Sequence, residues 1–241
     1  MERDVSVIDL STKQKLVIGC DSLGGIGSKE EDIVKVNSRI AGKFSARVAL
    51  MEVLAVGAIP ISLINTLSVE YEPTGKEIIA GIQEEVDLLS LTKNNIVTGS
   101  TEENIPTVQT GVGITVIGKA ATEKLRLANS QSGDLLVALG LPKVGNEVLD
   151  SLENVVNLTD MQRLLELDYI HDILPVGSKG IRYEAELLAE LNGLNLEFEE
   201  KEIDLEKSAG PATVLLLTLS EEYWIELQEL FDKPLNLVGR M

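Results

Sequence analysis

The chain has 241 residues and a formal net charge of −18, and 44% of its residues are apolar but only 3% are aromatic. This length suits one or two domains, and the composition suits a core of Val, Ile, Leu and Ala in a sheet covered by helices. The acidity would repel a nucleic-acid backbone, so we expect no nucleic-acid partner.

The counts of cysteine and histidine argue against several kinds of functional site. Cys20 is the single cysteine and is accompanied by a single histidine, which excludes an internal disulfide and argues against a zinc site or a Cys–His nucleophile. A bound metal would therefore have oxygen ligands. No apolar stretch reaches the roughly 18 residues of a membrane span, and no apolar signal segment follows the charged start. We expect a cytoplasmic protein without a membrane partner.

Hydrophobic periodicity predicts the elements of the first half in chain order. Alternating or β-branched segments predict strands at 4–10, 15–20, 61–69, 96–97 and 109–117. Helical spacing predicts a helix over 37–56, ended by Gly57, and a second helix from Pro73 to about residue 91.

A polar segment at 128–134, ANSQSGD, predicts a linker or surface loop, so we divide the chain into domains at 1–124 and 130–241. Beyond it, strands are predicted at 135–139, 170–176, 194–199 and 213–219. Helices are predicted at 145–152, 158–168, 180–192 and 221–231. This order predicts the α+β class with two lobes.

A glycine-rich loop follows the second predicted strand in the sequence CDSLGGIGSK. Asp21 would project from the end of that strand into a cleft, and Gly24, Gly25 and Gly27 would let backbone N–H groups approach a ligand closely. Lys29 could add a positive charge for a phosphate. The alternative is a simple turn. The spacing matches neither a Walker loop nor the dinucleotide fingerprint.

Glu52 is the second candidate. Its neighbours three and four residues away in the predicted helix are apolar or small, so its carboxylate should face the core. A buried carboxylate without a partner costs several kcal/mol in practice, so it needs a cation, a base or a proton. The alternative is a half-exposed position, or an ion pair with Arg47 or Lys43.

The third candidate is the segment TGSTEENIPT at 98–107, which gathers hydroxyls, two acids and an amide. Such a loop can ligate a hard cation through oxygens, although an ordinary Ser- or Asn-rich turn has the same composition. If Asp21, Glu52 and Glu102 or Glu103 converge, they form an oxygen-only site for Mg²⁺, with phosphates as further ligands.

These motifs together resemble the aminoimidazole ribonucleotide synthetase (AIR synthase) superfamily, which also holds thiamine-monophosphate kinase and selenophosphate synthetase. The segment ALMEVLAVGAIP (49–60) is similar to the family helix Asp-(Leu/Ile)-x-x-x-Gly-Ala-x-Pro, with Glu52 in place of the aspartate. TGST (98–101) stands where the family has Gly-Gly-Asp-Thr. Three later segments also fit, namely GVGITVIG (111–118), SGDLLVALGLPKVG (132–145) and SAGPATVLLLTL (208–219).

Two departures from the family pattern bear on function. Ser100 replaces the usual aspartate, and the kinase-type motif Asp-x-Ser-Asp-Gly-Leu appears as VGSKGI (176–181), with Lys179 in place of an acid. The second departure argues against thiamine-monophosphate kinase. The segment 98–118 is most similar to the α-ribazole kinase subfamily, which phosphorylates the primary hydroxyl of α-ribazole in cobalamin salvage.

The resemblance implies a two-domain fold with a mixed or antiparallel N-terminal sheet and a shortened C-terminal α/β domain. It implies that the first domain binds ATP and Mg²⁺ and pairs with its counterpart in a homodimer. The implied ATP contacts are Gly24, Gly25, Gly27, Lys29, Gly99, Ser100 and Thr101. From their positions, Asn65, Thr66, Gln109 and Thr110 are candidates for binding a nucleoside-like substrate.

Phosphoryl transfer depends mainly on positioning and charge neutralisation, so no general base is assigned. Two rival classes stay open. One is another ATP-dependent enzyme of the superfamily, such as a cyclo-ligase or a selenophosphate-type synthetase. The other is an ATP-binding relative without catalytic activity, in which Ser100 and Lys179 mark the lost acids.

Overall fold

The computed structural model describes residues 3–89, 96–199 and 203–241. These residues form two compact units. The N-terminal unit comprises the described residues of Asp4–Val53 and Ala58–Glu123, and the C-terminal unit comprises Arg3 with those of Leu54–Gly57 and Lys124–Met241. Each unit has a five-stranded sheet with helices, so the α+β class is confirmed.

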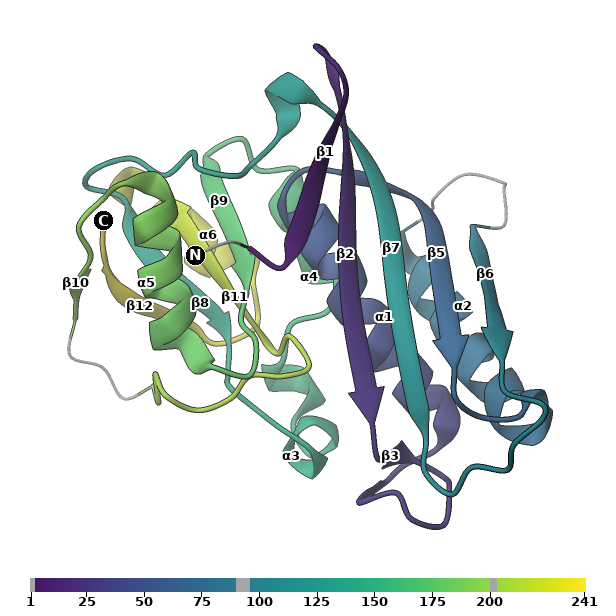
Figure 1. The fold of residues 1–241 in the computed structure, drawn as a ribbon. Helices are drawn as coiled ribbons and strands as arrows, with labels where there is room; N and C mark the ends of the chain where they lie inside the picture. The colour runs from purple at the N-terminus through teal and green to yellow at the C-terminus, as the bar shows by residue number, and fades with distance from the viewer. Residues whose placement is uncertain (1–2, 90–95, 200–202) are drawn as a thin grey trace. The chain divides into compact units, whose positions relative to one another are not determined.

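The sheet of the N-terminal unit has the strand order β1-β2-β7-β5-β6 (Figure 1). Its strands are β1 Val5–Ser11, β2 Gln14–Gly24, β5 Ile59–Leu67, β6 Val97–Thr101 and β7 Gly111–Ala121. Neighbours are antiparallel except β5 and β6, which are parallel. A separate parallel pair, β3 Ile26–Gly27 with β4 Val34–Lys35, lies in the segment that follows β2.

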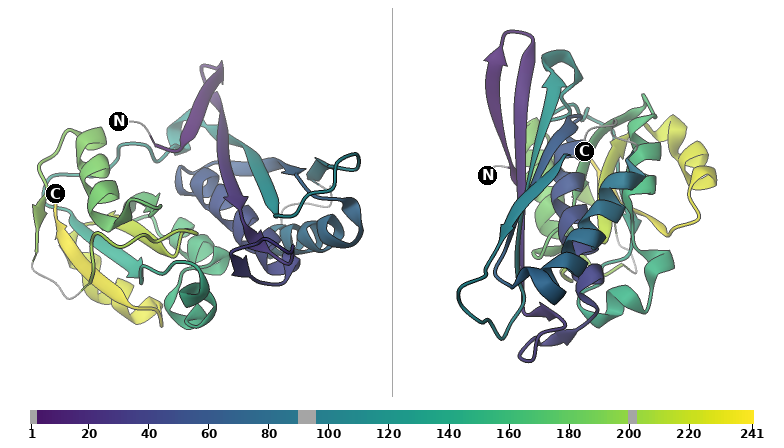
Figure 2. Two further views of the ribbon diagram at one scale, coloured as in Figure 1. Left: turned by 60° about the horizontal axis from the view of Figure 1, so that its bottom comes forward. Right: turned by 90° about the vertical axis from the view of Figure 1, so that its right-hand side faces the viewer.

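Two helices, α1 Ser38–Ala55 and α2 Lys76–Leu88, cover one face of this sheet (Figures 1 and 2). A π-helical turn, Tyr71–Gly75, precedes α2. The helices approach until their backbones nearly touch, because each has a glycine at the crossing. A Cβ added to Gly42 would lie 2.1 Å from the carbonyl oxygen of Ile78, and one added to Gly81 would lie 2.0 Å from that of Arg39.

A buried ion pair joins the same helices one turn or more further along. The guanidinium of Arg47 donates to both carboxylate oxygens of Glu85, with Nη2–Oε1 and Nε–Oε2 distances of 2.8 and 3.1 Å. The Arg47 guanidinium carbon also lies 4.6 Å from the centre of the Phe44 ring. Glu85 is fully buried, so its charge is stabilised by Arg47 in place of water.

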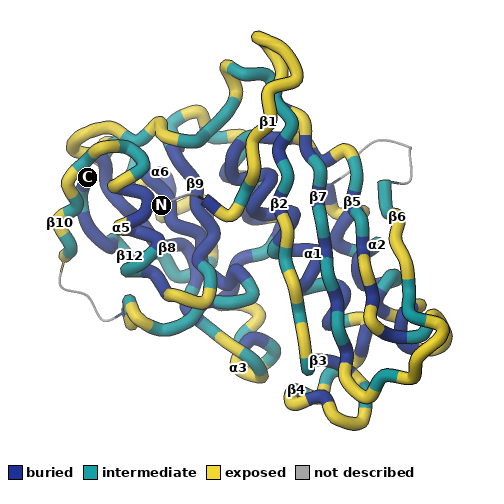
Figure 3. The backbone as a smooth tube through the Cα atoms, viewed as in Figure 1, coloured by how far each residue is buried: buried dark blue, intermediate teal, exposed yellow. Residues whose placement is uncertain are grey.

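Within the described residues of the N-terminal unit, no helix covers the other face of the sheet, which we call the open face (Figure 2). Strand β1 is exposed along almost its whole length (Figure 3). The open face carries Cys20, which is exposed and lies 3.5 Å from the hydroxyl of Thr115. Strand pairing places Ile8, 46% exposed, on the same face.

The sheet of the C-terminal unit is antiparallel throughout, with the order β10-β12-β8-β11-β9. Its strands are β8 Leu135–Gly140, β9 Ile170–Pro175, β10 Glu197–Phe198, β11 Val214–Leu219 and β12 Leu235–Arg240. The helices are α3 Asn146–Leu149, α4 Leu158–Leu165, α5 Gly180–Asn192 and α6 Trp224–Leu230. Short 3-10 turns lie at Thr122–Lys124, Leu152–Asn154 and Glu221–Tyr223.

Local sequence explains the limits of these helices. Asn157 begins α4 by accepting hydrogen bonds from Thr159 N and Asp160 N, and Asp160 completes a capping box. Gly193 ends α5 at φ 65°, a conformation that favours glycine. Leu187 and Leu188 of α5 belong to the apolar core, together with residues of β8 and β11. Among the described helices, none combines the length with the apolar composition that a membrane span requires.

Several elements differ from the predicted ones, and the two differences that most change the sheets concern β2 and β12. Strand β2 continues four residues beyond its expected end at residue 20, because it pairs with β7 as far as Gly24. The predicted elements end at residue 231, whereas β12 follows at Leu235–Arg240 and lies between β10 and β8. The predicted helix end at 90–91 lies outside the described residues.

Candidate functional site

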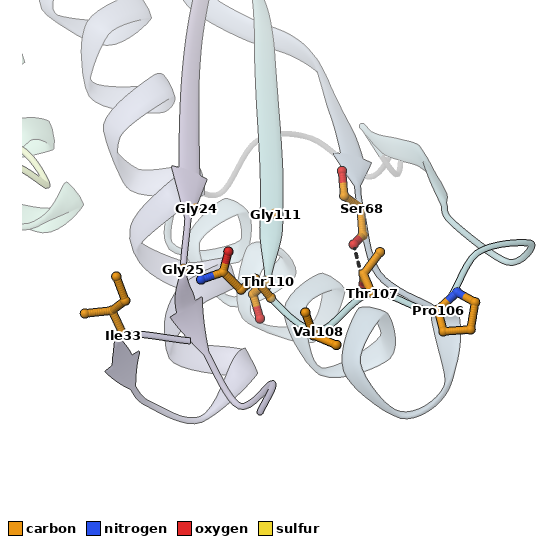
Figure 4. Close-up of a pocket in the computed structure, with 10 residues that line it drawn as sticks. Gly24, Gly25, Ile33, Ser68, Pro106, Thr107, Val108, Thr110 and Gly111 are labelled. Carbon is orange, nitrogen blue, oxygen red and sulfur yellow. Dashed lines mark hydrogen bonds between the residues drawn. The ribbon is translucent and has the colours of Figure 1, made fainter. Parts of the chain in front are cut away.

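A surface pocket of about 640 Å³ lies where the glycine loop meets the segment before β7 (Figure 4). Gly24 and Gly25 line it from the end of β2, and Gln109 and Thr110 line it from the segment before β7. The rest of the lining is Ile33, Ser68, Pro106, Thr107, Val108 and Gly111. The pocket thus brings together two of the predicted ATP contacts and two of the predicted substrate contacts.

Backbone hydrogen bonds fix the walls of this pocket. Gly25 N donates to Thr110 O at 2.9 Å, and Ile33 N donates to Gly25 O at 2.8 Å. Gly25 adopts φ 69°, which explains why glycine stands there. A Cβ at Gly27 would lie 2.4 Å from Thr110 Oγ1, so the absence of a side chain at Gly27 leaves space for the side chain of Thr110.

Asp32 is the buried residue that joins the two sides. Its carboxylate accepts hydrogen bonds from Thr110 N and Thr110 Oγ1, both at 2.7 Å, and from Lys29 N at 2.8 Å. Asp32 was not among the residues predicted from sequence. The signal was weak, because it ends a run of three acids, KEEDIV, in which only the structure distinguishes a buried carboxylate from solvated ones.

Lys29, expected to face a phosphate, instead forms an ion pair with Glu70. Burial opposes ionisation of Glu70, but hydrogen bonds from Lys29 and Thr74 outweigh it and hold the pKa of Glu70 below its ordinary value. The ammonium group of Lys29 is therefore already neutralised by a protein carboxylate.

Asp21 and Glu52 lie in the layer between the sheet and α1. Asp21 lies within β2, opposite Ile114 of β7, and not at the strand's end as expected. It shares a face with Gly19, where an added Cβ would lie 3.4 Å from Cβ of Glu52. Glu52 is 6% exposed, which agrees with its expected inward position, and the alternative partners Arg47 and Lys43 pair with Glu85 and Glu84.

Burial raises the pKa of Asp21 to about 6, although a backbone hydrogen bond from Ser22 lowers it in part. Because the folded pKa exceeds the ordinary value of 3.8, the native state binds more protons than the unfolded state between about pH 4 and 6. The free energy of unfolding therefore falls as the pH rises through this window and the Asp21 carboxyl ionises. Above about pH 6 the full destabilisation by the buried carboxylate is present.

We predict that Asp21→Asn raises the free energy of unfolding by about 1–2 kcal/mol at pH 8. The rise in the pKa of Asp21 corresponds to a destabilisation of roughly 3 kcal/mol, which sets the upper limit of this gain. The gain should disappear near pH 4, where the carboxyl is largely protonated in the folded state. Urea unfolding at both pH values, with exposed Asp4→Asn as the control, measures it. A gain of the same size at pH 4 would contradict desolvation of the Asp21 carboxylate as its cause.

Glu102 and Glu103 serve local hydrogen bonds in the structure. Glu102 Oε1 accepts from Asn104 N and Ile105 N, which lowers the pKa of Glu102. Glu103 Oε1 accepts from Tyr71 N and Thr101 Oγ1. Strand β6, which precedes them, lies three strand spacings from β2, or about 14 Å.

A single magnesium ion on all four predicted carboxylates does not fit this placement. Across residues 3–89, 96–199 and 203–241, no group of three or more His, Cys, Asp or Glu side chains is placed to hold a metal. Asp21 and Glu52 are the two predicted ligands that share a layer, and their binding of Mg²⁺ stays a prediction.

The remaining predicted residues lie on or beside strand β6. Gly99, Ser100 and Thr101 belong to this edge strand and not to a loop. The buried Asn65 side chain donates to Thr98 O at 2.9 Å and fills the space beside Gly99, where a Cβ would lie 2.3 Å from Asn65 Oδ1. Thr66 is exposed on the open face. None of these residues lines the pocket.

Comparison with family models finds a similarity that covers most of the N-terminal unit. Residues 2–120 match the model described as AIR synthase related protein, N-terminal domain. These residues are therefore similar to the AIR synthase related N-terminal domain. The match includes the glycine loop, the Gly-Ala-x-Pro helix end and both walls of the pocket.

Solved structures extend the likeness to the whole chain. Thiamine monophosphate kinase from Aquifex aeolicus is 15% identical with a TM-score of 0.70, and the match covers 98% of this chain and 88% of that one. The structure of AaThiL complexed with AMPPCP and TMP is 17% identical with a TM-score of 0.65, covering 100% and 84%. T. maritima PurL complexed with ATP is 15% identical with a TM-score of 0.64, covering 98% and 42%.

At these identities the likeness shows the fold alone. It confirms the expected AIR-synthase-like fold with a shortened second domain. Comparison with curated proteins found no match to this chain.

Proposed function

We propose that the protein is an ATP-dependent kinase that phosphorylates the primary hydroxyl of α-ribazole to α-ribazole 5′-phosphate, in cobalamin salvage in the cytoplasm. The observation that carries the proposal is the pocket in which Gly24 and Gly25 meet Gln109 and Thr110. A volume of about 640 Å³ is in the range of small-molecule sites.

The family and the fold support an ATP-dependent reaction. The N-terminal unit is AIR synthase related, and the fold is shared with thiamine-monophosphate kinases and with a PurL structure that holds ATP. Gly27, Lys29, Gly99, Ser100 and Thr101 stay predicted ATP contacts, and for Lys29 this contact requires that its ammonium leave Glu70. Mg²⁺ would accompany the triphosphate, with Asp21 and Glu52 as its predicted protein ligands, since such carboxylates suit a hard cation.

Chemistry at this site would depend on what the chain positions. The buried Glu52 carboxylate and Asp21 supply negative charge in a layer of low solvent exposure, where electrostatic effects are strong. Asp32 holds the pocket wall through Thr110. No described residue is assigned as a general base, in line with a reaction that needs mainly alignment and charge neutralisation.

The test is ADP formation with ATP, Mg²⁺ and α-ribazole, compared with thiamine monophosphate as the acceptor. We expect turnover with α-ribazole and a loss of about 100-fold or more in Glu52→Gln, the scale of removing one electrostatic group from a site. Glu84→Gln, which changes a partly exposed glutamate of α2, is the matched control and should keep full activity.

The other outcomes separate the rival classes. Turnover with a different acceptor would point to another enzyme of the superfamily. ATP binding without turnover on any acceptor would point to a relative without catalytic activity. Circular dichroism of Glu52→Gln shows that the loss does not come from unfolding.

We also propose that the protein is a homodimer and that a second copy covers the open face. Exposed apolar side chains on a sheet face lose unfavourable contact with water when another surface covers them. Ile8 is 46% exposed there, and its strand β1 has little cover from its own unit. Light scattering after size exclusion measures the mass, and a monomer at micromolar concentration would refute this proposal.

A further inference from the structure

The pocket beside the glycine loop carries no charge in its lining. Its described lining residues are glycine, proline, aliphatic, hydroxyl and amide residues, and none of them ionises near neutral pH. This is unexpected for a polyphosphate site, because bound phosphates normally meet Lys, Arg or several free backbone N–H groups.

Two groups that could have held a phosphate are already engaged. Gly25 N donates to Thr110 O at the end of the β2–β7 ladder. The nearby ammonium of Lys29 is bound to Glu70. Neither the amide of Gly25 nor the Lys29 ammonium is therefore available to a phosphate, although the glycines suggest a phosphate loop in the sequence.

The lining instead suits a flat, apolar group. Gly24, Gly25 and Gly111 present main chain without side chains, so a ring could lie against them. Ile33 is 87% exposed and Val108 is 58% exposed, and Figure 4 shows both at the pocket. Covering such side chains with an aromatic ring removes apolar surface from water.

The walls are fixed before any ligand arrives. The amide nitrogen of Gln109 donates to Glu31 O at 2.7 Å, and Thr107 Oγ1 donates to Ser68 O at 2.8 Å. Asp32 holds the backbone and hydroxyl of Thr110. A preformed wall lowers the ordering cost of binding, and its polar atoms can orient the edge of a heterocycle.

We infer that this pocket binds the uncharged aromatic base of the nucleoside-like acceptor and not the triphosphate of ATP. The inference rests on the proposed function and reassigns Gly24 and Gly25 from the triphosphate to the acceptor. It names the substrate class as a nucleoside with a neutral, largely apolar heterocycle.

The test adds a side chain to the lining of the pocket. A Cβ added at Gly24 would meet no atom within 4 Å, so Gly24→Leu adds an apolar side chain to the lining without a steric clash of its first atom. The probes are α-ribazole, benzimidazole and inorganic tripolyphosphate, titrated calorimetrically into the full chain. The matched control is Ser22→Leu, which adds the same side chain at an exposed position of β2 outside the lining.

We expect Gly24→Leu to weaken α-ribazole and benzimidazole at least about 10-fold, the effect of losing one good apolar contact surface, and to leave tripolyphosphate binding unchanged. Ser22→Leu should change neither. A second variant, Ile33→Asp, places a charge at the rim and should weaken the ring probes in the same way. Its control is Ile59→Asp, which alters another exposed isoleucine, outside the lining.

The inference is overturned if both Gly24→Leu and Ile33→Asp bind the ring probes as tightly as the unaltered chain does. It is also overturned if either variant loses tripolyphosphate binding instead. The third contrary result is an unaltered chain that binds neither ring probe. Failure of the kinase proposal has a different signature. If α-ribazole yields no ADP but ring binding still responds to Gly24→Leu, the pocket assignment stands and the proposed reaction falls.

Discussion

Glu85→Ala is expected to lower the free energy of unfolding of the N-terminal unit by about 3–5 kcal/mol, since it leaves the charge of Arg47 buried without its partner. Arg47 is 8% exposed and Glu85 is fully buried, so water cannot replace the lost carboxylate. The substitution removes both guanidinium–carboxylate hydrogen bonds, which have lengths of 2.8 and 3.1 Å.

Urea unfolding followed by far-ultraviolet circular dichroism measures this loss. Trp224, the single tryptophan, lies in α6 of the C-terminal unit, so its fluorescence monitors that unit separately. The double variant Arg47→Met/Glu85→Leu is the control, because replacing both charges by apolar groups is often neutral. A loss below about 1 kcal/mol in Glu85→Ala would show that the pair is solvated, in conflict with its burial.

Gly81→Val is expected to cost about 3 kcal/mol or more, at the upper end of overpacking effects, because the new side chain meets backbone that cannot move aside alone. The Cβ would lie 2.0 Å from Arg39 O, whereas ordinary contact begins near 3.4 Å. Gly42 has the same role on α1, facing Ile78 O at 2.1 Å. Helices α1 and α2 must therefore separate along their crossing.

Gly81→Ala sharpens this test, because two effects have opposite signs. Alanine favours a helix over glycine by about 1 kcal/mol, so propensity alone predicts a more stable protein. The contact with Arg39 predicts a less stable one. Gly24→Ala, at a glycine with open space around its Cβ, is the control and should change stability little. A stabilised Gly81→Ala protein would refute the close helix crossing.

The elements with a clear apolar period were predictable from sequence. The helix expected at 37–56 is α1 Ser38–Ala55, and the strand expected at 213–219 is β11 Val214–Leu219. The inward position of Glu52 also followed from that period, because helical spacing fixes which side chains share a face. Local sequence was sufficient for these two elements, because most of α1 is buried and β11 is a fully buried apolar run.

Features that depend on a partner element were not predictable. The extension of β2 to Gly24 comes from pairing with β7, and Asp21 was therefore expected at a strand end that does not exist. From sequence, a glycine in the middle of a helix indicates only a low helix propensity at that position. In the structure, Gly42 and Gly81 are the positions at which α1 and α2 cross closely. Asp32 joins segments 78 positions apart, which no local pattern reveals.

The position of Cys20 on the open face gives the protein an intrinsic chemical reporter. It is the single thiol of the chain and is exposed beside Thr115. Its rate of reaction with a thiol reagent therefore reports on one small area of β2 without any engineered label. If a second copy covers that area, modification should slow as protein concentration rises, and dilution should restore the rate.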